Sequence, residues 1–355
     1  MTLPSHMSAV QLTAHGGPEV LVWRDDLPLP RPGPAEVLVQ VLAAGVNNTD
    51  INTRLGWYSS AVTGATEEGI VAKDGGWAGA LDFPRIQGAD LCGRVVALGE
   101  GVIGPAIGTR VTCAAVQPAP SLHNPNGFVT LGSEYDGAFA QYCVLPVDQL
   151  YDVSASPLSD IEIAAIPCAF GTAEALITRA GILPGQSVLV TGASGGVGLA
   201  AVALAHLRGA RVTGITNPAK AEAVRAAGAS DILDRDATPP AGSFDAVIDI
   251  VGGSGWAARL DALRPGGICA VAGAIAGPMV TTDLRRLYLN DLTIRGSTYQ
   301  PPEIFARLVS LINAGAIRPL VSNTYPLRAI ARAQEDFMSK HYPGKLVLLP
   351  QESAP

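Results

Sequence analysis

The residues with the clearest chemical potential are four glycines, at 192, 195, 196 and 198, in the segment SVLVTGASGGVGLAAVALAHLRG (187–209). A short β-branched and aliphatic run enters this turn, and an apolar pattern typical of a helix leaves it. Glycine lets the backbone approach a pyrophosphate, while the free N–H groups and the dipole of a helix start favour negative charge. The segment therefore predicts a cradle for a dinucleotide, with contacts from Ser194, Gly195, Gly196 and Val197.

The stretch after the second predicted strand bears on the choice of dinucleotide. A fold that prefers NAD usually has an acidic side chain here, which bonds the ribose 2′-hydroxyl and would repel a 2′-phosphate. This chain has Thr216, Asn217 and Lys220 instead, with no carboxylate between Arg211 and Lys220. This favours NADP(H). In the alternative interpretation, Asn217 and Pro218 only begin a helix, as an N-cap residue and a first-turn proline, and Lys220 is solvated.

Two later strands should also reach the cofactor, because open α/β sheets bind ligands at the carboxyl ends of their strands. Val251 and Gly252 follow one of these strands, and the small residues Ala272, Gly273 and Ala274 follow the next. Small residues let the backbone come close to a nicotinamide. The competing interpretation is that they only pack together at tight strand ends.

The elements that must position these residues alternate between strand and helix from about 160 to 297, which predicts a doubly wound parallel sheet with right-handed crossovers. Its six predicted strands are 187–191, 211–216, 231–233, 244–251, 267–273 and 292–297. The residues before about 153 form short strands between Pro- and Gly-rich turns, which indicates a β-rich, barrel-like domain.

The tail of the chain has a different pattern, with helices predicted near 302–314 and 327–340 and a strand at 345–349. We expect this tail to rejoin the first domain and to leave a cleft between the two domains. The predicted boundaries are therefore 1–155 for the β-rich domain, 156–298 for the dinucleotide-binding domain and 299–355 for the return.

Two long connections interrupt the β-rich domain, at 59–85 and 117–137. Connections of this length without secondary structure of their own are usually either functional lids or mobile surface. Aromatic residues gather in or beside the first one: Trp57, Tyr58, Trp77 and Phe83. They indicate an apolar lid over a pocket for a hydrophobic or flat substrate, or a loop held in place by its own aromatic side chains.

Composition excludes several classes of partner. The net charge is −7 and there is no run of Lys or Arg, which argues against binding to nucleic acid or to an anionic membrane. No apolar stretch approaches the ~18 residues of a membrane span, and the first residues lack the pattern of a signal peptide. The five cysteines are scattered, with no CxxC pair. We expect a cytoplasmic protein.

Several segments together resemble the medium-chain dehydrogenase/reductase superfamily, and within it the zinc-independent quinone oxidoreductase and enoyl reductase group. They are GPAEVLVQVLAAGVNNTDINTRLGWY, PRIQGADLCGRVVALGEGV, GAFAQYCVLP, TGASGGVG, FDAVIDIVGG, LRPGGICAVAGAIAG and PGKLVLLP. The resemblance implies an α/β architecture, a Rossmann doubly wound sheet plus a GroES-like β-barrel catalytic domain. The longer connection at 59–85 departs from the group's pattern.

The resemblance also shows where a metal site is missing. Zinc-dependent members bind a catalytic metal through a cysteine, the histidine of Gly-His-Glu and a further thiol. The matching positions here hold Asn47, Ala89 and Cys168, with Asp90 in place of the glutamate. Because a catalytic zinc ion needs three protein ligands, we expect no metal.

Without a metal, side chains must polarise the substrate carbonyl and deliver a proton. The resemblance implies that Tyr58 and Asn47 do so, with Asn47 also near the cofactor. Asp50, Arg54, Trp57, Tyr58 and Trp77 would line the substrate pocket. For Asp50 and Arg54 we favour a structural ion pair, and Tyr58 as a shield over an apolar wall is the alternative to catalysis.

Three further residues are matched by the resemblance. Thr172 corresponds to a threonine that bonds the cofactor. Arg235 stands where relatives place a tyrosine that contacts the 2′-phosphate. Lys345 matches a lysine near the closing strand, and its role is left open.

These observations predict a zinc-independent NADPH-dependent oxidoreductase that reduces a quinone or the C=C bond of an α,β-unsaturated carbonyl compound. The alternatives are reduction of a ketone or aldehyde, with Tyr58 as the acid, and a cofactor-binding protein with little turnover. Members of the superfamily are commonly dimers, so we expect a homodimer acting on a small hydrophobic carbonyl or quinone substrate.

Overall fold

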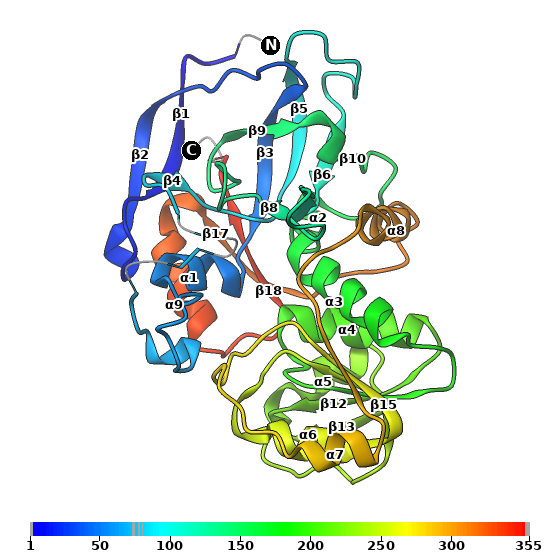
Figure 1. Ribbon diagram of the computed structural model, residues 1–355. Coiled ribbons are helices and arrows are strands. Elements are labelled where there is room, and N and C mark those ends of the chain that lie inside the picture. Colours follow the sequence, from blue (N-terminus) through cyan, green and yellow to red (C-terminus); the bar gives the residue numbers. More distant parts are fainter. Residues whose placement is uncertain (1–2, 73–74, 77–78, 80, 352–355) are drawn as a thin grey trace. The chain divides into compact units, whose positions relative to one another are not determined.

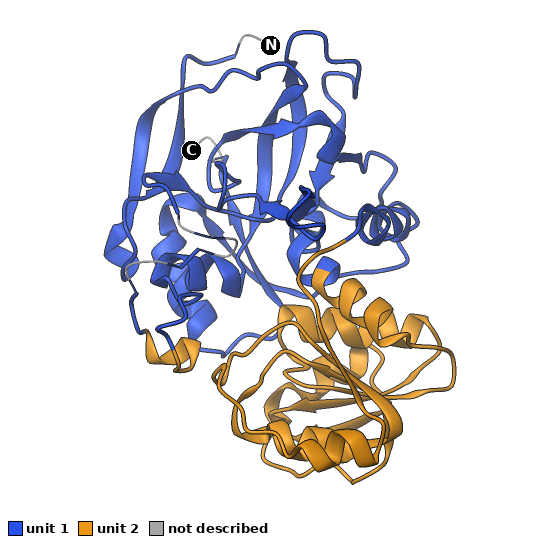
Figure 2. Cartoon of the chain, viewed as in Figure 1, with its two compact units in different colours: residues 1–62, 70–171, 301–355 blue, residues 63–69, 172–300 orange. Residues whose placement is uncertain are grey.

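The computed structural model describes residues 3–72, 75–76, 79 and 81–351. The chain forms two compact units (Figure 2): unit 1 comprises 1–62, 70–171 and 301–355, and unit 2 comprises 63–69 and 172–300. The segment 301–355 therefore belongs to unit 1, together with the first residues of the chain. Trp77, a predicted pocket residue, lies outside the described residues. In the part of the chain that the structure describes, no helix is long and apolar enough to span a membrane.

Unit 2 is built on a six-stranded sheet in the order β13-β12-β11-β14-β15-β16, with every neighbouring pair parallel. The strands are β11 (Ser187–Val190), β12 (Arg211–Thr216), β13 (Asp231–Asp234), β14 (Phe244–Asp249), β15 (Leu263–Val271) and β16 (Thr293–Gly296). The order reverses between β11 and β14, which is the switch point of a doubly wound fold. The predicted Rossmann sheet is confirmed.

Helices connect these strands (Figure 1): α4 (Gly196–Leu207), α5 (Ala221–Ala226), α6 (Trp256–Ala262) and α7 (Leu284–Leu289). Helix α4 is rich in Ala and Leu and buries most of its residues, because a crossover helix must cover the apolar face of the sheet. Short 3-10 turns begin two connections, η4 (Pro218–Lys220) and η5 (Gly253–Gly255). Helix α3 (Pro167–Ala180) begins in unit 1 and ends in unit 2.

Unit 1 is rich in strands. Its main sheet follows the order β10-β6-β5-β3-β18-β17, and β9 also pairs with β3. These strands are β3 (Glu36–Gly45), β5 (Cys92–Leu98), β6 (Arg110–Cys113), β9 (Tyr142–Pro146), β10 (Leu150–Asp152), β17 (Val321–Pro326) and β18 (Lys345–Leu349). A second sheet holds β1 (His6–Leu12), β2 (Leu21–Pro28) and β4 (Arg85–Ile86).

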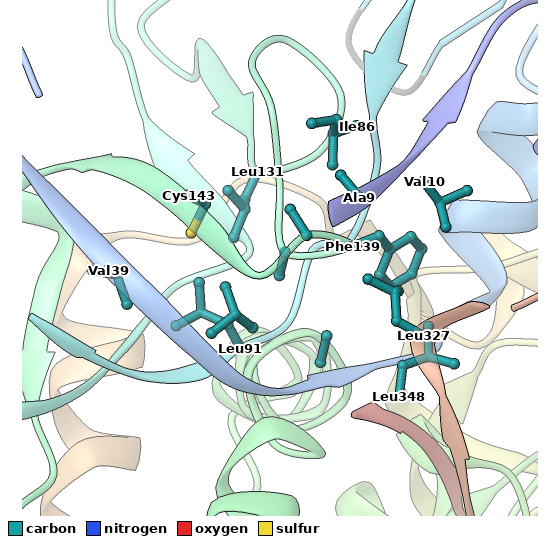
Figure 3. Close-up of a cluster of buried hydrophobic side chains, with 14 of the residues drawn as sticks. Ala9, Val10, Val39, Ile86, Leu91, Leu131, Phe139, Cys143, Leu327 and Leu348 are labelled. Carbon is teal, nitrogen blue, oxygen red and sulfur yellow. The ribbon is translucent and has the colours of Figure 1, made fainter. Parts of the chain in front are cut away.

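The core of unit 1 joins parts of the chain that are far apart in sequence. Val39, Leu91, Phe139 and Leu348 are fully buried in one apolar cluster (Figure 3). Strand β18 reaches this core by pairing antiparallel to the end of β3. The helices of the unit are α1 (Asn48–Leu55), α2 (Asp160–Ala164), α8 (Pro302–Asn313) and α9 (Ile330–Met338).

The two long connections are not structureless. The connection 117–137 contains most of a hairpin of β7 (Val116–Pro118) and β8 (Phe128–Thr130). In the connection 59–85, the 3-10 turn η2 (Thr66–Glu68) belongs to unit 2, where the Thr66 N–H donates to the carbonyl oxygen of Ile275 at 3.3 Å.

Candidate functional site

The glycine-rich turn between β11 and α4 depends on a close backbone approach. Gly192 has a left-handed φ of 56°, and a Cβ on Gly198 would lie only 2.2 Å from the Gly192 carbonyl oxygen. Gly195 is exposed, and a Cβ there would meet nothing nearer than 3.5 Å. Ser194, Gly196 and Val197 are partly exposed beside Gly195, so the start of α4 leaves room for a pyrophosphate.

A buried hydroxyl marks the end of β12. Thr216 is 4% exposed, and its Oγ1 has no hydrogen-bond partner. Because a buried polar atom without a partner is uncommon, this hydroxyl fits a ligand group that approaches the strand end. The glycine turn and Thr216 together suit a bound dinucleotide.

The neighbours of Thr216 serve the local fold as well. The Asn217 Oδ1 accepts a hydrogen bond from the N–H of Ala219 at 2.9 Å, so the predicted N-cap is confirmed. Burial lowers the pKa of Lys220. The side chain of Arg235, which follows β13, is 69% exposed, with Nε 3.7 Å from the Asp236 carboxylate. Both cations therefore lie beyond the ends of the strands that flank this region.

The sequence analysis missed Asp249, which ends β14. Its carboxylate is fully buried and accepts hydrogen bonds from the Thr191 hydroxyl at 2.7 Å and from the Val251 N–H at 3.0 Å. Thr191 directly precedes Gly192, so this one carboxylate ties the glycine-rich turn to the end of β14. The available signal was an acidic residue inside the otherwise apolar run VIDIV.

Unit 1 contains a buried polar cluster of Asn47, Asp90 and Lys345. The Lys345 ammonium donates to the Asp90 Oδ2 at 2.9 Å and to the Asn47 Oδ1, and the Asn47 Nδ2 also donates to the Asp90 Oδ2 at 2.9 Å. Lysine has no acceptor, so the oxygen of the Asn47 amide must face Lys345 and its nitrogen must face Asp90. No pattern in the sequence indicates this contact, because Asn47 and Lys345 are 298 positions apart.

Asp50 lies beside this cluster at the start of α1. Its carboxylate accepts the Asn47 N–H at 2.8 Å, which caps the helix. Burial raises the pKa of Asp50 to about 7, and the charge of Asp90 acts in the same direction. The Lys345 ammonium and backbone hydrogen bonds from Asn47 and Ala89 oppose this rise.

The expected ion pair between Asp50 and Arg54 is wrong. The Arg54 guanidinium is buried and donates to the Gly16 carbonyl oxygen at 2.6 Å and to the Gln334 Oε1 at 2.9 Å. It thereby joins α1 to the turn before β2 and to α9. Arg54 points to these backbone and amide acceptors because Asp50, one helical turn earlier, is already engaged by the N-terminal cap.

Tyr58 follows α1 in the same unit. Its hydroxyl donates to the Thr49 Oγ1 at 3.1 Å, and its ring packs edge-to-face against Trp57, with centroids 5.6 Å apart. Burial raises the pKa of Tyr58 to about 12, although hydrogen bonds with Thr49 and Asn52 lower it in part. The phenol is therefore protonated throughout the physiological range, as a proton or hydrogen-bond donor must be.

Comparison with known proteins gives the family. Residues 33–155 match the model of the alcohol dehydrogenase GroES-like domain, and residues 221–348 match that of the zinc-binding dehydrogenases. A crystal structure presented as an alcohol dehydrogenase from Sinorhizobium meliloti 1021 is 40% identical, with a TM-score of 0.90 over 98% of each chain. The chain belongs to the medium-chain dehydrogenase/reductase superfamily.

Named relatives of this medium-chain dehydrogenase/reductase have several activities. An acryloyl-coenzyme A reductase of Metallosphaera sedula is 29% identical over 96% of this chain and 99% of its own length. A quinone oxidoreductase of Lama guanicoe is 29% identical over 97% of both chains. An NAD-dependent alcohol dehydrogenase of Sulfurisphaera tokodaii is 26% identical over 97% of this chain and all of its own. Together with the two domain matches, these relatives support the quinone oxidoreductase-like group.

In this superfamily member, the positions matched to zinc ligands have other surroundings. Ala89 and Cys168 pack with Ala115 in a small apolar cluster, and the Cys168 N–H donates to the Asp90 Oδ1 at 2.6 Å. Among the described residues, no group of three or more His, Cys, Asp or Glu side chains could hold a metal ion.

The predicted site residues fall into the two units. Unit 1 brings together Asn47, Asp50 and Tyr58 around the start of α1. Unit 2 holds the other expected cofactor residues, at or after the carboxyl ends of its strands, and the half-buried Thr172 in α3, whereas Asn47, also expected near the cofactor, lies in unit 1.

Proposed function

We propose that this protein is a zinc-independent oxidoreductase that uses NADPH to reduce a quinone or the C=C bond of an α,β-unsaturated carbonyl compound. The observation that carries the zinc-independent part is the Lys345 ammonium, bonded to both Asn47 and Asp90. A divalent cation beside these residues would meet a positive charge, and the matched positions offer one thiol, Cys168, where a catalytic zinc ion needs three ligands.

The preference for NADPH rests on the residues after β12 and β13. Thr216 offers an unpartnered hydroxyl, Asn217 a neutral amide, and Lys220 and Arg235 positive charges suited to a 2′-phosphate dianion. Contacts from Ser194, Gly195, Gly196 and Val197 would hold the pyrophosphate. Because one relative is NAD-dependent, the assay must also include NADH.

Bound at these residues, the nicotinamide supplies the hydride. The residues of unit 1 would then act on the substrate carbonyl. Tyr58, with a pKa of about 12, stays protonated and would donate a hydrogen bond or a proton to the oxygen on which negative charge develops. The Asn47 amide, whose orientation Lys345 fixes, would support the same oxygen by giving up the long hydrogen bond of 3.5 Å from its Nδ2 to the Gly45 carbonyl oxygen.

Two of the relatives, an acryloyl-coenzyme A reductase and a quinone oxidoreductase, support this proposed substrate class. The second candidate is reduction of a ketone or aldehyde to an alcohol, which the alcohol dehydrogenase relative favours.

We also propose a homodimer formed through β16. This strand is the last in the order of its sheet, and no strand among the described residues pairs with its outer edge. That edge could therefore pair with the same strand of a second copy. Large apolar side chains around it are exposed: Met279, Val280, Leu284, Tyr288, Leu289 and Ile294. Light scattering should give twice the chain mass of 36.4 kDa, whereas a mass of one chain would contradict the dimer.

The decisive experiment follows oxidation of NADPH and of NADH with a quinone, an enone and a ketone, identifies each product and measures zinc in the same sample. A saturated carbonyl or a hydroquinone formed with NADPH supports the proposal. An alcohol from the ketone alone supports the second candidate. Stoichiometric zinc would refute the zinc-independent mechanism, and binding without turnover on the whole panel would refute the enzymatic proposal.

A further inference from the structure

One ion pair at the carboxyl edge of the unit 2 sheet has an unusual second partner. Arg259 of α6 donates from a single nitrogen, Nη1, to the Asp249 Oδ2 at 3.0 Å and to the carbonyl oxygen of Gly252 at 2.7 Å. The Asp249 carboxylate is fully buried and also accepts the Gly252 N–H at 3.3 Å. The peptide groups on both sides of Gly252 are therefore held by one ion pair.

The segment that this pair holds is a backbone turn of special conformation. Gly252 and Gly253 have φ values of 61° and 67°, which side chains rarely adopt. A Cβ on Gly252 would lie 2.9 Å from the Gly277 carbonyl oxygen, and one on Gly253 would lie 2.6 Å from that of Ala276. The turn is thus pressed against the segment 272–277.

Backbone hydrogen bonds then join the two segments. The Ala276 N–H donates to the Val251 carbonyl oxygen at 2.8 Å, and the Gly253 N–H donates to that of Gly277 at 3.1 Å. A Cβ on Gly273 would lie 2.7 Å from the Ile250 carbonyl oxygen. The glycines at these strand ends are therefore required by the packing of the two segments on each other, whether or not they also touch a cofactor.

This arrangement lies where doubly wound sheets bind their ligands. The segments 250–253 and 272–277 follow β14 and β15, neighbouring parallel strands whose carboxyl ends form the edge where doubly wound sheets bind ligands. Val251 and residues 272–275 remain partly exposed there. Asp249 also holds Thr191, at the entrance to the glycine-rich turn, with a hydrogen bond of 2.7 Å. The Asp249 carboxylate thus ties the ends of β11 and β14 together, and the backbone of 251–253 continues the connection to the segment after β15.

We propose that Arg259, acting through Asp249 and the Gly252 carbonyl, is a positioning residue for the nicotinamide dinucleotide. It would hold the backbone of both segments in the binding geometry before the cofactor arrives, which lowers the ordering cost of binding. This inference rests on the proposed function, because it assumes that the dinucleotide occupies this edge of the sheet.

The test compares Arg259→Met with a matched ion pair elsewhere in unit 2. Arg208, after α4, donates to Glu174 and to the Thr178 hydroxyl in α3, and it precedes the amino end of β12. The exposed fractions match: 13% and 1% for Arg208 and Glu174, and 11% and 0% for Arg259 and Asp249. The two pairs thus differ in place and not in burial.

Binding of NADPH and NADH is measured by protein fluorescence for wild type, Arg259→Met, Arg259→Lys and Arg208→Met. We expect Arg259→Met to bind the preferred cofactor about tenfold more weakly, a loss of ~1.4 kcal/mol. Arg259→Lys should recover part of the affinity. Arg208→Met should bind the cofactor as tightly as wild type does, even though its melting temperature should fall about as much as that of Arg259→Met. Hydrogen exchange in 250–253 and 272–277 should rise only in the Arg259 variants.

The possible outcomes distinguish the inference from the proposed function. If Arg259→Met binds the cofactor as tightly as Arg208→Met does, Arg259 has only a structural role and the inference fails. The proposed function is not affected by that result. If wild type binds neither NADPH nor NADH, the proposed function fails first. Should Arg259→Met not fold, the comparison passes to Arg259→Lys, in which unchanged affinity and unchanged exchange would overturn the inference.

Discussion

Asp50 should make the stability of unit 1 depend on pH in a direction opposite to that of most carboxylates. Its pKa is about 7 in the folded protein, against 3.8 for an unperturbed aspartate. The folded state therefore holds a proton that the unfolded state releases, and stability is lost as pH rises from the unfolded pKa through the folded one. The pKa difference of about three units corresponds to about 4 kcal/mol.

The variant that tests this is Asp50→Asn, which removes the titration and keeps an acceptor for the Asn47 N–H. The free energy of unfolding of wild type minus that of the variant should fall by about 2 kcal/mol between pH 5 and pH 7, and should level off above pH 8. Urea unfolding followed by circular dichroism at each pH gives this difference, in which the histidines common to both proteins cancel.

A matched control is Asp148→Asn, an exposed aspartate of unit 1. Because this variant also removes one carboxylate, it controls for the loss of a charge at an exposed position. A difference for Asp50→Asn that is flat from pH 5 to pH 7, or that rises with pH, would refute the argument that burial dominates at this site.

Three further experiments test other parts of the site. Tyr58→Phe should slow reduction about 100-fold at saturating substrate, because the proton or hydrogen-bond donor is lost; an unchanged rate would remove Tyr58 from the mechanism. Gly198→Ala should cost about 1–3 kcal/mol by overpacking and weaken dinucleotide binding, while Gly195→Ala, which has room for its Cβ in the free protein, should leave the free energy of unfolding unchanged. Lys345→Met should destabilise the protein by about 3–5 kcal/mol in urea unfolding, because it leaves the Asp90 carboxylate buried without its cation; adding Asp90→Asn should restore part of the loss.

Local pattern was enough to predict the dinucleotide-binding unit. The glycines of the turn, the apolar strand before it and the helix after it lie within about twenty residues, and the structure places them as the spacing indicates. The six strands of unit 2 overlap the predicted ranges, although β15 begins at Leu263 instead of 267 and β14 ends at Asp249 instead of 251. Asn217 was correctly expected to cap a helical turn for the same local reason.

Contacts between distant residues could not be predicted in this way. Nothing in the spacing of Asn47 or Lys345 indicates that they meet, because β18 must first pair with β3. Arg54 was expected to pair with its neighbour on α1, yet its acceptors come from Gly16 and Gln334 on other elements. In each case tertiary packing supplies partners that no single segment contains.

The pairing of β18 with β3 also bears on the order in which the chain acquires structure during synthesis. Unit 1 lacks β18 until residues 345–349 have been made, whereas unit 2 has all its residues once residue 300 has been made. Until β18 is present, Ala44 and Gly45 at the end of β3 lack the strand that pairs with them. Unit 1 is thus the unit whose synthesis begins first and whose apolar core is completed last.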